Sequence, residues 1–200
     1  MNKLRRREML GLLAAAPVAA GFVWTEAEAE QAHHQAQAAR QTAQKTGTAF
    51  KPKFFTAHEY AAVVILVDLI IPKDERSGSA TDAGVPEFMD FIVGDQPQRQ
   101  TAMRGGLAWL DRECERRFEK RFVACTEPQR RDVLDDISGL QPPAVTLTQG
   151  VAFFRMFRDL TASGFWTSKM GIADLKYMGN TLVLDWKGCP DEQLKKLGIA

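Results

Sequence analysis

The sequence predicts an all-α protein: a single helical domain of about six helices with a long irregular C-terminal loop rich in glycine and aromatic residues. Apolar residues recur at helical spacing in segments that capping residues separate, and no run alternates as a half-buried strand would. With 45% hydrophobic and 26% charged residues in a 200-residue chain, there is enough apolar material for one core.

An export signal is expected at residues 1–29. Basic residues precede an alanine- and glycine-rich apolar run, and Ala27-Glu28-Ala29 has the small-x-small form of a cleavage site. Arg6 and Arg7, followed by Glu, Met and Leu, resemble the twin-arginine pattern. We therefore expect a twin-arginine-type signal peptide, with a general secretory leader or an uncleaved anchor as the alternatives.

Residues 30–53 are predicted to form a polar tether. From Glu30 to Gly47 they are alanine, glutamine and other polar residues, so they favour helix by propensity but offer almost no large apolar side chain to bury. His33 and His34 lie in this segment. Adjacent residues on a helix point in different directions, so these two alone do not predict a metal site.

The folded domain is expected to span residues 54–200. Thr56 and Glu59 are spaced as a capping box, and an almost unbroken apolar run then continues to Ile71, before Pro72. This helix is apolar nearly all round, which predicts a central place in the core. Asp68 interrupts the run and needs a partner if buried, so we expect it to brace a loop, with a catalytic acid as the alternative.

Five further helices are indicated by periodicity, capping residues or propensity. The longest has apolar residues spaced by three and four and a mixed-charge face that suits solvent. The five are expected at Glu87–Val93, Gln98–Phe118, from the cap at Thr126 to just before Gly139, from Thr148 to Leu160, and Asp191–Leu197.

The segment from Leu160 to Pro190 is predicted to be irregular because glycines punctuate it. It also contains Phe165, Trp166, Tyr177 and Trp186 without a helical stripe. Such aromatic residues must be held by tertiary or partner contacts. The segment is therefore either a docking surface or a structural lid over the helices.

Three cysteines leave one unpaired even if two are bonded. Cys114 lies on an apolar helical seam and is expected to be a small buried hydrophobe. Cys125 and Cys189 lie beside turns, so a bridge between them is one interpretation and a bond from one of them to a partner chain is the other. No C-x-x-C-H motif is present for covalent haem attachment.

The chemistry of an independent enzyme is not evident. A formal charge of +1 gives no nucleic-acid footprint, and no G-x-G-x-x-G follows a strand. The predicted domain has one histidine, His58, which is expected at a solvated capping position. The hydroxyls of Thr161, Ser163, Thr167 and Ser168 therefore have only His58 as a base. We expect no catalytic residue, cofactor or metal on this chain.

Several motifs resemble the gluconate 2-dehydrogenase subunit 3 family. The C-terminal motifs are Thr161-Ala-Ser-Gly-Phe-Trp-Thr-Ser-Lys, Gly171-Ile-x-Asp174-Leu, Tyr177-x-Gly179-Asn180 and Trp186-x-Gly188-x-Pro190. Ile70-Ile71-Pro72, the stretch from Asp82 to Asp90 and the stretch from Gly106 to Asp111 fit the same family. The resemblance covers Phe54 to Pro190, with Trp166 at a position where tyrosine is more usual.

This resemblance implies a small, non-catalytic subunit of a periplasmic sugar or sugar-acid dehydrogenase. The large subunit of such complexes is an FAD-dependent flavoprotein of the glucose-methanol-choline type, often joined by a cytochrome c subunit. The small subunit supplies the export signal, here read by the twin-arginine translocase, and helps its partner mature. Membrane association is then indirect, through the complex. The expected partner interface comprises Phe165, Trp166, Thr167, Tyr177 and Trp186.

Two alternatives belong to other functional classes. One is an independent exported enzyme that uses Asp68 or the hydroxyls between Thr161 and Ser168. The other is a periplasmic chaperone that serves several clients.

Overall fold

The computed structural model describes residues 26–138, 147–177, 179, 184–185, 188–189 and 191–198. Over these residues the chain forms eight α-helices and one 3-10 helix and no strand, which confirms the all-α class. The elements are α2 (Glu26–Thr46), α3 (Ala57–Ile70), α4 (Val85–Asp95), α5 (Pro97–Phe118), η1 (Phe122–Ala124), α6 (Glu127–Ile137), α7 (Thr148–Trp166), α8 (Lys169–Asp174) and α9 (Asp191–Lys196).

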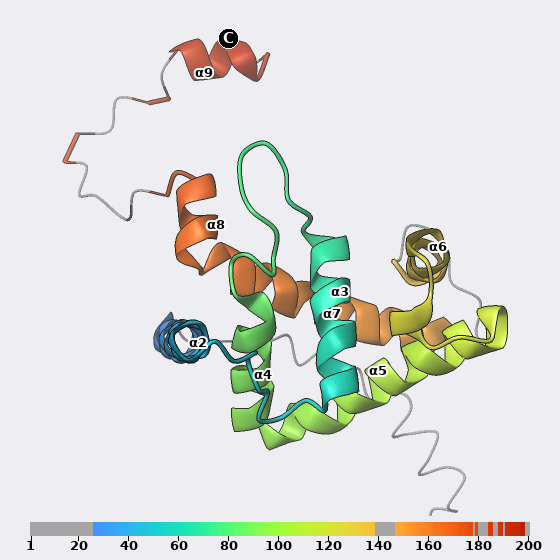
Figure 1. Cartoon of the computed structure of the whole chain (residues 1–200). Helices are drawn as coiled ribbons and strands as arrows, with labels where there is room; N and C mark the ends of the chain where they lie inside the picture. The colour runs from blue at the N-terminus through green and yellow to red at the C-terminus, as the bar shows by residue number, and fades with distance from the viewer. Residues whose placement is uncertain are drawn as a thin grey trace, which may run out of the picture.

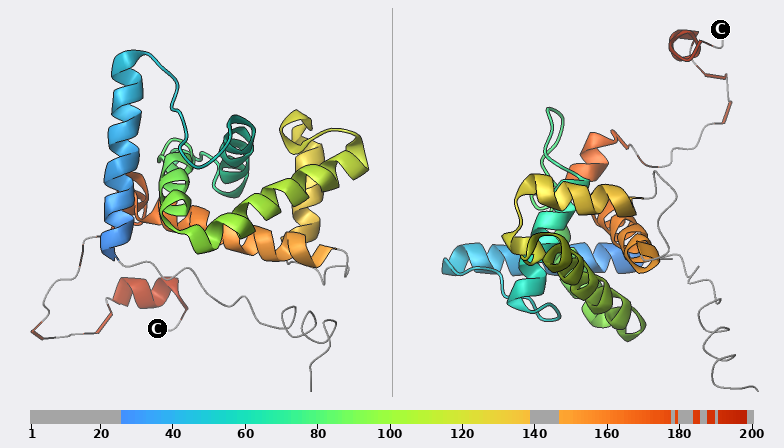
Figure 2. Two further views of the ribbon diagram at one scale, coloured as in Figure 1. Left: turned by 90° about the horizontal axis from the view of Figure 1, so that it is seen from below. Right: turned by 90° about the vertical axis from the view of Figure 1, so that its right-hand side faces the viewer.

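Helix α7 is the central element, because it packs against α3, α4, α5, α6 and α8. Figure 1 shows α7 passing behind α3, with α4 standing beside α3. In Figure 2, α2 runs along the outer side of α4, at the edge of the bundle. The C-terminal end of α7 thus lies at the same side of the molecule as α2 and α8.

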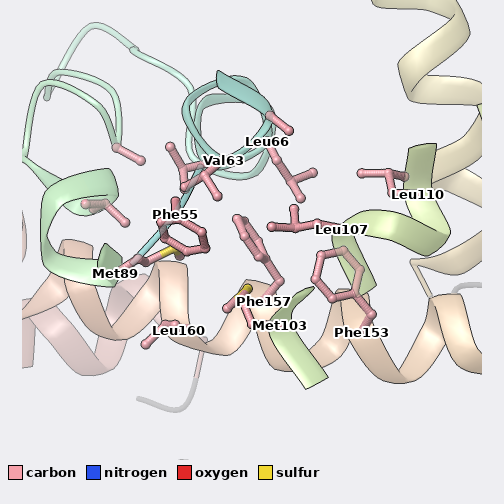
Figure 3. Close-up of a cluster of buried hydrophobic side chains, with 14 of the residues drawn as sticks. Phe55, Val63, Leu66, Met89, Met103, Leu107, Leu110, Phe153, Phe157 and Leu160 are labelled. Carbon is pink, nitrogen blue, oxygen red and sulfur yellow. The ribbon is translucent and has the colours of Figure 1, made fainter. Parts of the chain in front are cut away.

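The core lies where α3, α4, α5 and α7 meet, and their large apolar side chains exclude water from it (Figure 3). Two glycines allow close approach between α5 and α7. A Cβ added to Gly106 would lie 1.8 Å from Cδ2 of Phe153, and one added to Gly150 would lie 2.2 Å from Cη2 of Trp109. Figure 3 labels the core residues Phe55, Val63, Leu66, Met89, Met103, Leu107, Leu110, Phe153, Phe157 and Leu160.

The predicted start of α3 is confirmed. The Thr56 hydroxyl accepts from the Glu59 N–H at 3.2 Å, and the Glu59 carboxylate accepts from the Thr56 N–H at 2.8 Å. The predicted role of Asp68 as a brace is also confirmed, since its Oδ1 accepts from the Thr81 N–H at 2.8 Å. Asp68 thereby ties the end of α3 to the loop that leads into α4.

The prediction of a solvated tether at 30–53 is wrong for residues 30–46, which belong to α2 and pack against α4. Ala29, Ala32, His33 and Ala36 are buried and follow one another at helical spacing. Because alanine buries little surface, this face lacks the large side chains that usually reveal a core helix. Many small contacts, rather than a few large ones, hold the helix in place.

The prediction of an irregular segment from Leu160 onward is wrong as far as Asp174. Helix α7 continues to Trp166, and α8 follows after two residues. Gly164 and Gly171 are sites of close contact instead of turns. A Cβ at Gly164 would lie 2.8 Å from Cδ1 of Phe88, and one at Gly171 would lie 2.1 Å from the carbonyl oxygen of Phe165.

Some predicted features lie outside the described residues. They include Arg6, Arg7, most of the predicted signal peptide, and Trp186. Ala27-Glu28-Ala29, the predicted cleavage motif, lies within the first turns of α2. Among the helices of the described residues, none is long and apolar enough to cross a membrane.

Candidate functional site

The C-terminal end of α7 turns sharply into α8 through a compact set of hydrogen bonds. The buried Ser168 hydroxyl donates to the Phe165 carbonyl at 2.6 Å and accepts from the Gly171 N–H at 3.1 Å, which caps α8. Because Gly171 lies directly against the Phe165 backbone, the two helices meet without an intervening side chain. This junction fixes the direction in which α8 leaves the bundle.

An exposed apolar surface follows this junction, and we call it the α8 patch. It consists of Trp166, Ile172, Leu175 and Tyr177, with exposed fractions of 38%, 39%, 56% and 59%. The Tyr177 N–H donates to the Ile172 carbonyl at 3.1 Å, and the Trp166 backbone lies beside Gly171. The four residues are therefore neighbours in space, not merely in sequence. Exposed Trp and Tyr beside large aliphatic side chains are typical of protein interfaces.

The exposed loop between α3 and α4 is held against α8 by an ion pair and a hydrogen bond. Within the loop, Asp74 Oδ1 accepts from the N–H groups of Arg76 and Ser77, both at 2.8 Å, and these bonds hold the pKa of Asp74 below its usual value. Across to α8, Nη2 of Arg76 contacts both the side-chain Oδ1 and the carbonyl oxygen of Asp174 at 2.9 Å. In Figure 1 the loop rises beside α8. The loop and the α8 patch thus belong to one braced surface.

The residues predicted for the interface occupy different positions in this surface. Trp166 and Tyr177 are exposed on it, and Thr167 is exposed at the α7 end. Phe165, in contrast, is 1% exposed and packs edge-on against Trp166, with ring centroids 4.8 Å apart. Phe165 therefore supports the patch from the core. Ile172 and Leu175 were not among the predicted interface residues, although their spacing of three would place them on one face of a helix.

His33, expected in a solvated segment, joins α2 to α4 and to the end of α7. Its ring stacks on Phe88 of α4 at 4.7 Å, and its Nε2 lies 2.7 Å from Oγ1 of Thr167. The Thr167 hydroxyl donates its proton to the Ser163 carbonyl at 2.6 Å, so the Nε2–H of His33 must be the donor to Thr167. This orientation makes the pair a structural link between α2 and α7, since the imidazole does not take the hydroxyl proton.

We expect the docking of α2 to weaken as the pH falls. Burial, and then the neighbouring His34, lowers the pKa of His33 from 6.5 to about 4. Because the pKa of His33 is lower in the folded state than in the unfolded state, the neutral imidazole contributes fully to folding stability above pH 6.5. This contribution is lost as the pH falls from 6.5 toward 4. Thermal unfolding measured between about pH 7 and about pH 4.5 should show this loss in the wild type.

Two variants test the assignment of this pH dependence. His33→Gln should remove most of the loss, because an amide at this position cannot titrate. His34→Gln is the matched control, since His34 is exposed on the same helix, and it should keep most of the wild-type pH dependence because the burial of His33, the larger cause of its lowered pKa, is unchanged. An equal effect of the two variants would contradict the role given to His33.

The hydroxyls considered for catalysis are occupied by the backbone. Thr161, Ser163, Thr167 and Ser168 each donate to a carbonyl oxygen of α7, at 2.6 to 2.9 Å. Of these four hydroxyls, that of Thr167 lies beside an imidazole, that of His33, but its proton is donated to the Ser163 carbonyl, so the pair is not arranged as a nucleophile and its base. His58 lies in the first turn of α3 with 40% of its side chain exposed, and its Nε2 lies 2.5 Å from Asp111 Oδ2 on α5. Because Asp111 Oδ1 accepts the Phe122 N–H, the two residues join α3 to α5 and η1.

A cavity of about 560 Å³ lies between α2, residues 50–54 and α4, and carboxylates line part of it. Asp90 is fully engaged there, since it accepts three backbone N–H groups. Burial raises the pKa of Glu87, although Arg40 and the Tyr60 hydroxyl oppose this rise. In the described part of the chain, no group of three or more His, Cys, Asp or Glu residues is placed to hold a metal ion.

The cysteines do not form the bridge considered between Cys125 and Cys189. All three are free thiols; Cys125 is buried and Cys189 is exposed. The predicted burial of Cys114 is confirmed, at 0% exposure. Cys125 lies beside Cys114 and not on the surface, which accounts for the difference from the predicted pairing.

Comparison with known proteins gives one match. A family model described as gluconate 2-dehydrogenase subunit 3 matches residues 57–184, which is well over half of the chain. No curated protein and no solved structure matches. The matched range begins at α3 and includes α8 and all four residues of the α8 patch. The chain therefore belongs to the gluconate 2-dehydrogenase subunit 3 family.

Proposed function

We propose that this chain is the non-catalytic small subunit of an FAD-dependent sugar or sugar-acid dehydrogenase, and that it holds the flavoprotein subunit through the α8 patch. The family membership supports a place in a dehydrogenase complex. The observation that carries the choice of surface is the exposure of four large apolar side chains at one braced corner of the molecule. A partner that covers them would remove this apolar area from water.

The surroundings of the α8 patch suit a protein partner. Exposed lysines at 169 and 176 and the ion pair between Arg76 and Asp174 surround the apolar residues. Interfaces of this kind have an apolar centre and a polar rim that stays hydrated. The α7–α8 junction and the Arg76 contacts also fix the patch before binding, so little ordering remains to be done on association.

We also propose a type of partner and a route of export for this chain. The flavoprotein belongs to the glucose-methanol-choline type, binds the FAD and carries out the oxidation. A cytochrome c subunit completes the complex in some members of the family. Arg6 and Arg7 direct the chain to the twin-arginine translocase, and the folded flavoprotein travels with it to the periplasm. There the complex meets the membrane through its other subunits.

The test is a pull-down of the full, tagged chain from the envelope of its native cell. The recovered material is identified by mass spectrometry, and its absorption spectrum is recorded before and after addition of candidate sugars. We expect one flavoprotein in a one-to-one ratio with the chain, with oxidised-flavin bands that bleach on addition of substrate. The chain separated from its partner should be colourless and should have no dehydrogenase activity.

Other outcomes separate the alternatives. Turnover by the colourless chain alone would contradict a non-catalytic role and would favour an independent enzyme. Recovery of several unrelated clients in ratios well below one to one would favour a periplasmic chaperone. A chain recovered only from the cytoplasm would contradict the proposed export.

A further inference from the structure

Two of the three cysteines are buried in the core, Cys114 near the end of α5 and Cys125 directly after η1. Cys114 is 0% exposed and Cys125 is 4% exposed. Burial raises the pKa of the Cys114 thiol to about 12, and a hydrogen-bonding contact with the Cys125 thiol adds to this rise. Neither the family assignment nor the proposed partner surface gives these two neighbouring sulfurs a role.

The chain is fixed so that the two sulfurs stay together. After α5, Glu119 adopts a left-handed conformation with φ of 57° and reverses the chain. The N–H of Phe122 then donates to Asp111 Oδ1 at 3.0 Å, which holds η1 over α5. From the other side, the Arg130 guanidinium donates to the carbonyl oxygens of Phe122 and Val123, at 3.0 and 2.7 Å.

We propose that Cys114 and Cys125 become joined in an intramolecular disulfide once the chain is in an oxidising compartment. This inference rests on the export that is part of the proposed function. It places the unpaired cysteine at Cys189, which is exposed. The bond would join the last turns of α5 to the residue that follows η1, two elements that already contact one another.

The oxidant is the disulfide of a thiol–disulfide oxidoreductase. One cysteine loses its proton and attacks that disulfide, which forms a mixed disulfide and releases one thiol of the oxidoreductase. The second cysteine loses its proton and displaces the other thiol. Two electrons and two protons have then moved to the oxidoreductase, and one S–S bond has replaced two S–H bonds. Because both sulfurs are buried and the chain arrives folded with its partner, exchange takes place during local opening of residues 119–126.

The first experiment determines the redox state of the exported protein. The full chain is trapped with acid, unfolded, alkylated with N-ethylmaleimide and digested without reduction, and its peptides are analysed by mass spectrometry. We expect Cys189 alone to be alkylated and the peptides of Cys114 and Cys125 to be linked. Alkylation of both Cys114 and Cys125 in chain recovered from the periplasm would overturn the proposal.

A second experiment does not depend on export or on a partner, so it separates failure of this inference from failure of the proposed function. The purified full chain is refolded in a buffer of oxidised and reduced glutathione. The bond between Cys114 and Cys125 should form and should raise Tm by roughly 5–10 °C over the reduced chain. Cys189→Ser should keep this difference and Cys125→Ser should abolish it. Refolded chain that retains both thiols, or pairs Cys125 with Cys189, would contradict the inference.

Discussion

Asp90→Ala is expected to lower the free energy of unfolding by about 4 kcal/mol, the largest effect of any single substitution considered for this chain. Asp90 is 3% exposed on α4. Its Oδ2 accepts from the Lys53 N–H at 2.8 Å, and its Oδ1 accepts from the N–H groups of Phe54 and Phe55 at 2.9 and 3.0 Å. Alanine leaves all three donors without this acceptor, and the Phe55 donor lies in the core, where water does not replace it.

The measurement is urea unfolding followed by far-UV circular dichroism. Asp95→Ala is the matched control, because Asp95 is an exposed aspartate at the end of the same helix. Surface substitutions of this kind usually change stability by less than about 0.5 kcal/mol. Similar unfolding midpoints for the two variants would show that Asp90 does not hold residues 53–55 in place.

Gly106→Ala and Gly105→Ala are expected to change stability in opposite directions, although the two glycines are adjacent on α5. A Cβ at Gly105 meets no atom within 4 Å, so alanine there should stabilise the helix by about 0.5–1 kcal/mol. At Gly106 the Cβ would lie 1.8 Å from Cδ2 and 2.3 Å from Cγ of Phe153. Displacing this buried ring should destabilise the protein by about 1–3 kcal/mol, even after the gain in helix propensity.

Urea unfolding of the two alanine variants measures this contrast directly, and each serves as the control for the other. The ring of Phe153 is 5% exposed and packs against Phe157 in the core, so it has little room to move aside. A stabilising effect at both positions would mean that α5 and α7 do not approach as closely as the structure has them.

Much of the helical body could be predicted because local signals agreed with the tertiary structure. The capping box at Thr56 and the cap at Thr126 mark real helix starts, and the brace expected of Asp68 follows from the need to pair a carboxylate near the core. In these segments the local capping signals and the tertiary contacts place the helix ends at the same residues.

The packing of α2 and the helical course of residues 161–174 escaped prediction for physical reasons. In α2 the buried residues are alanines and a histidine, whose spacing is helical but whose side chains are too small or too polar to suggest a core face. In α7 and α8, Gly164 and Gly171 suggested turns, whereas they serve close packing against Phe88 and the Phe165 backbone. A glycine that a neighbour requires cannot be distinguished from a turn glycine without that neighbour.

The composition of the α8 patch could also be predicted only in part, because it depends on the positions of neighbouring elements. Sequence analysis selected Trp166 and Tyr177 by residue type, and both are exposed. Phe165 was selected as well, although it is buried, because its burial beside the exposed Trp166 depends on the continuation of α7 beyond Leu160, which was not predicted. Ile172, Leu175 and the Arg76 brace became evident only with the positions of α8 and the loop.

The most direct test of the central claim compares the flavoprotein recovered with three forms of the tagged full chain. Leu175→Asp places a charge in the α8 patch at a side chain that is 56% exposed, so the chain should still fold. Ala102→Asp places the same charge at an exposed position on α5 and is the control. We predict that the wild type and Ala102→Asp retain the flavoprotein, and that Leu175→Asp weakens its binding at least about tenfold without loss of helix content by circular dichroism. Full retention by Leu175→Asp, or no flavoprotein with the wild type, would contradict the account.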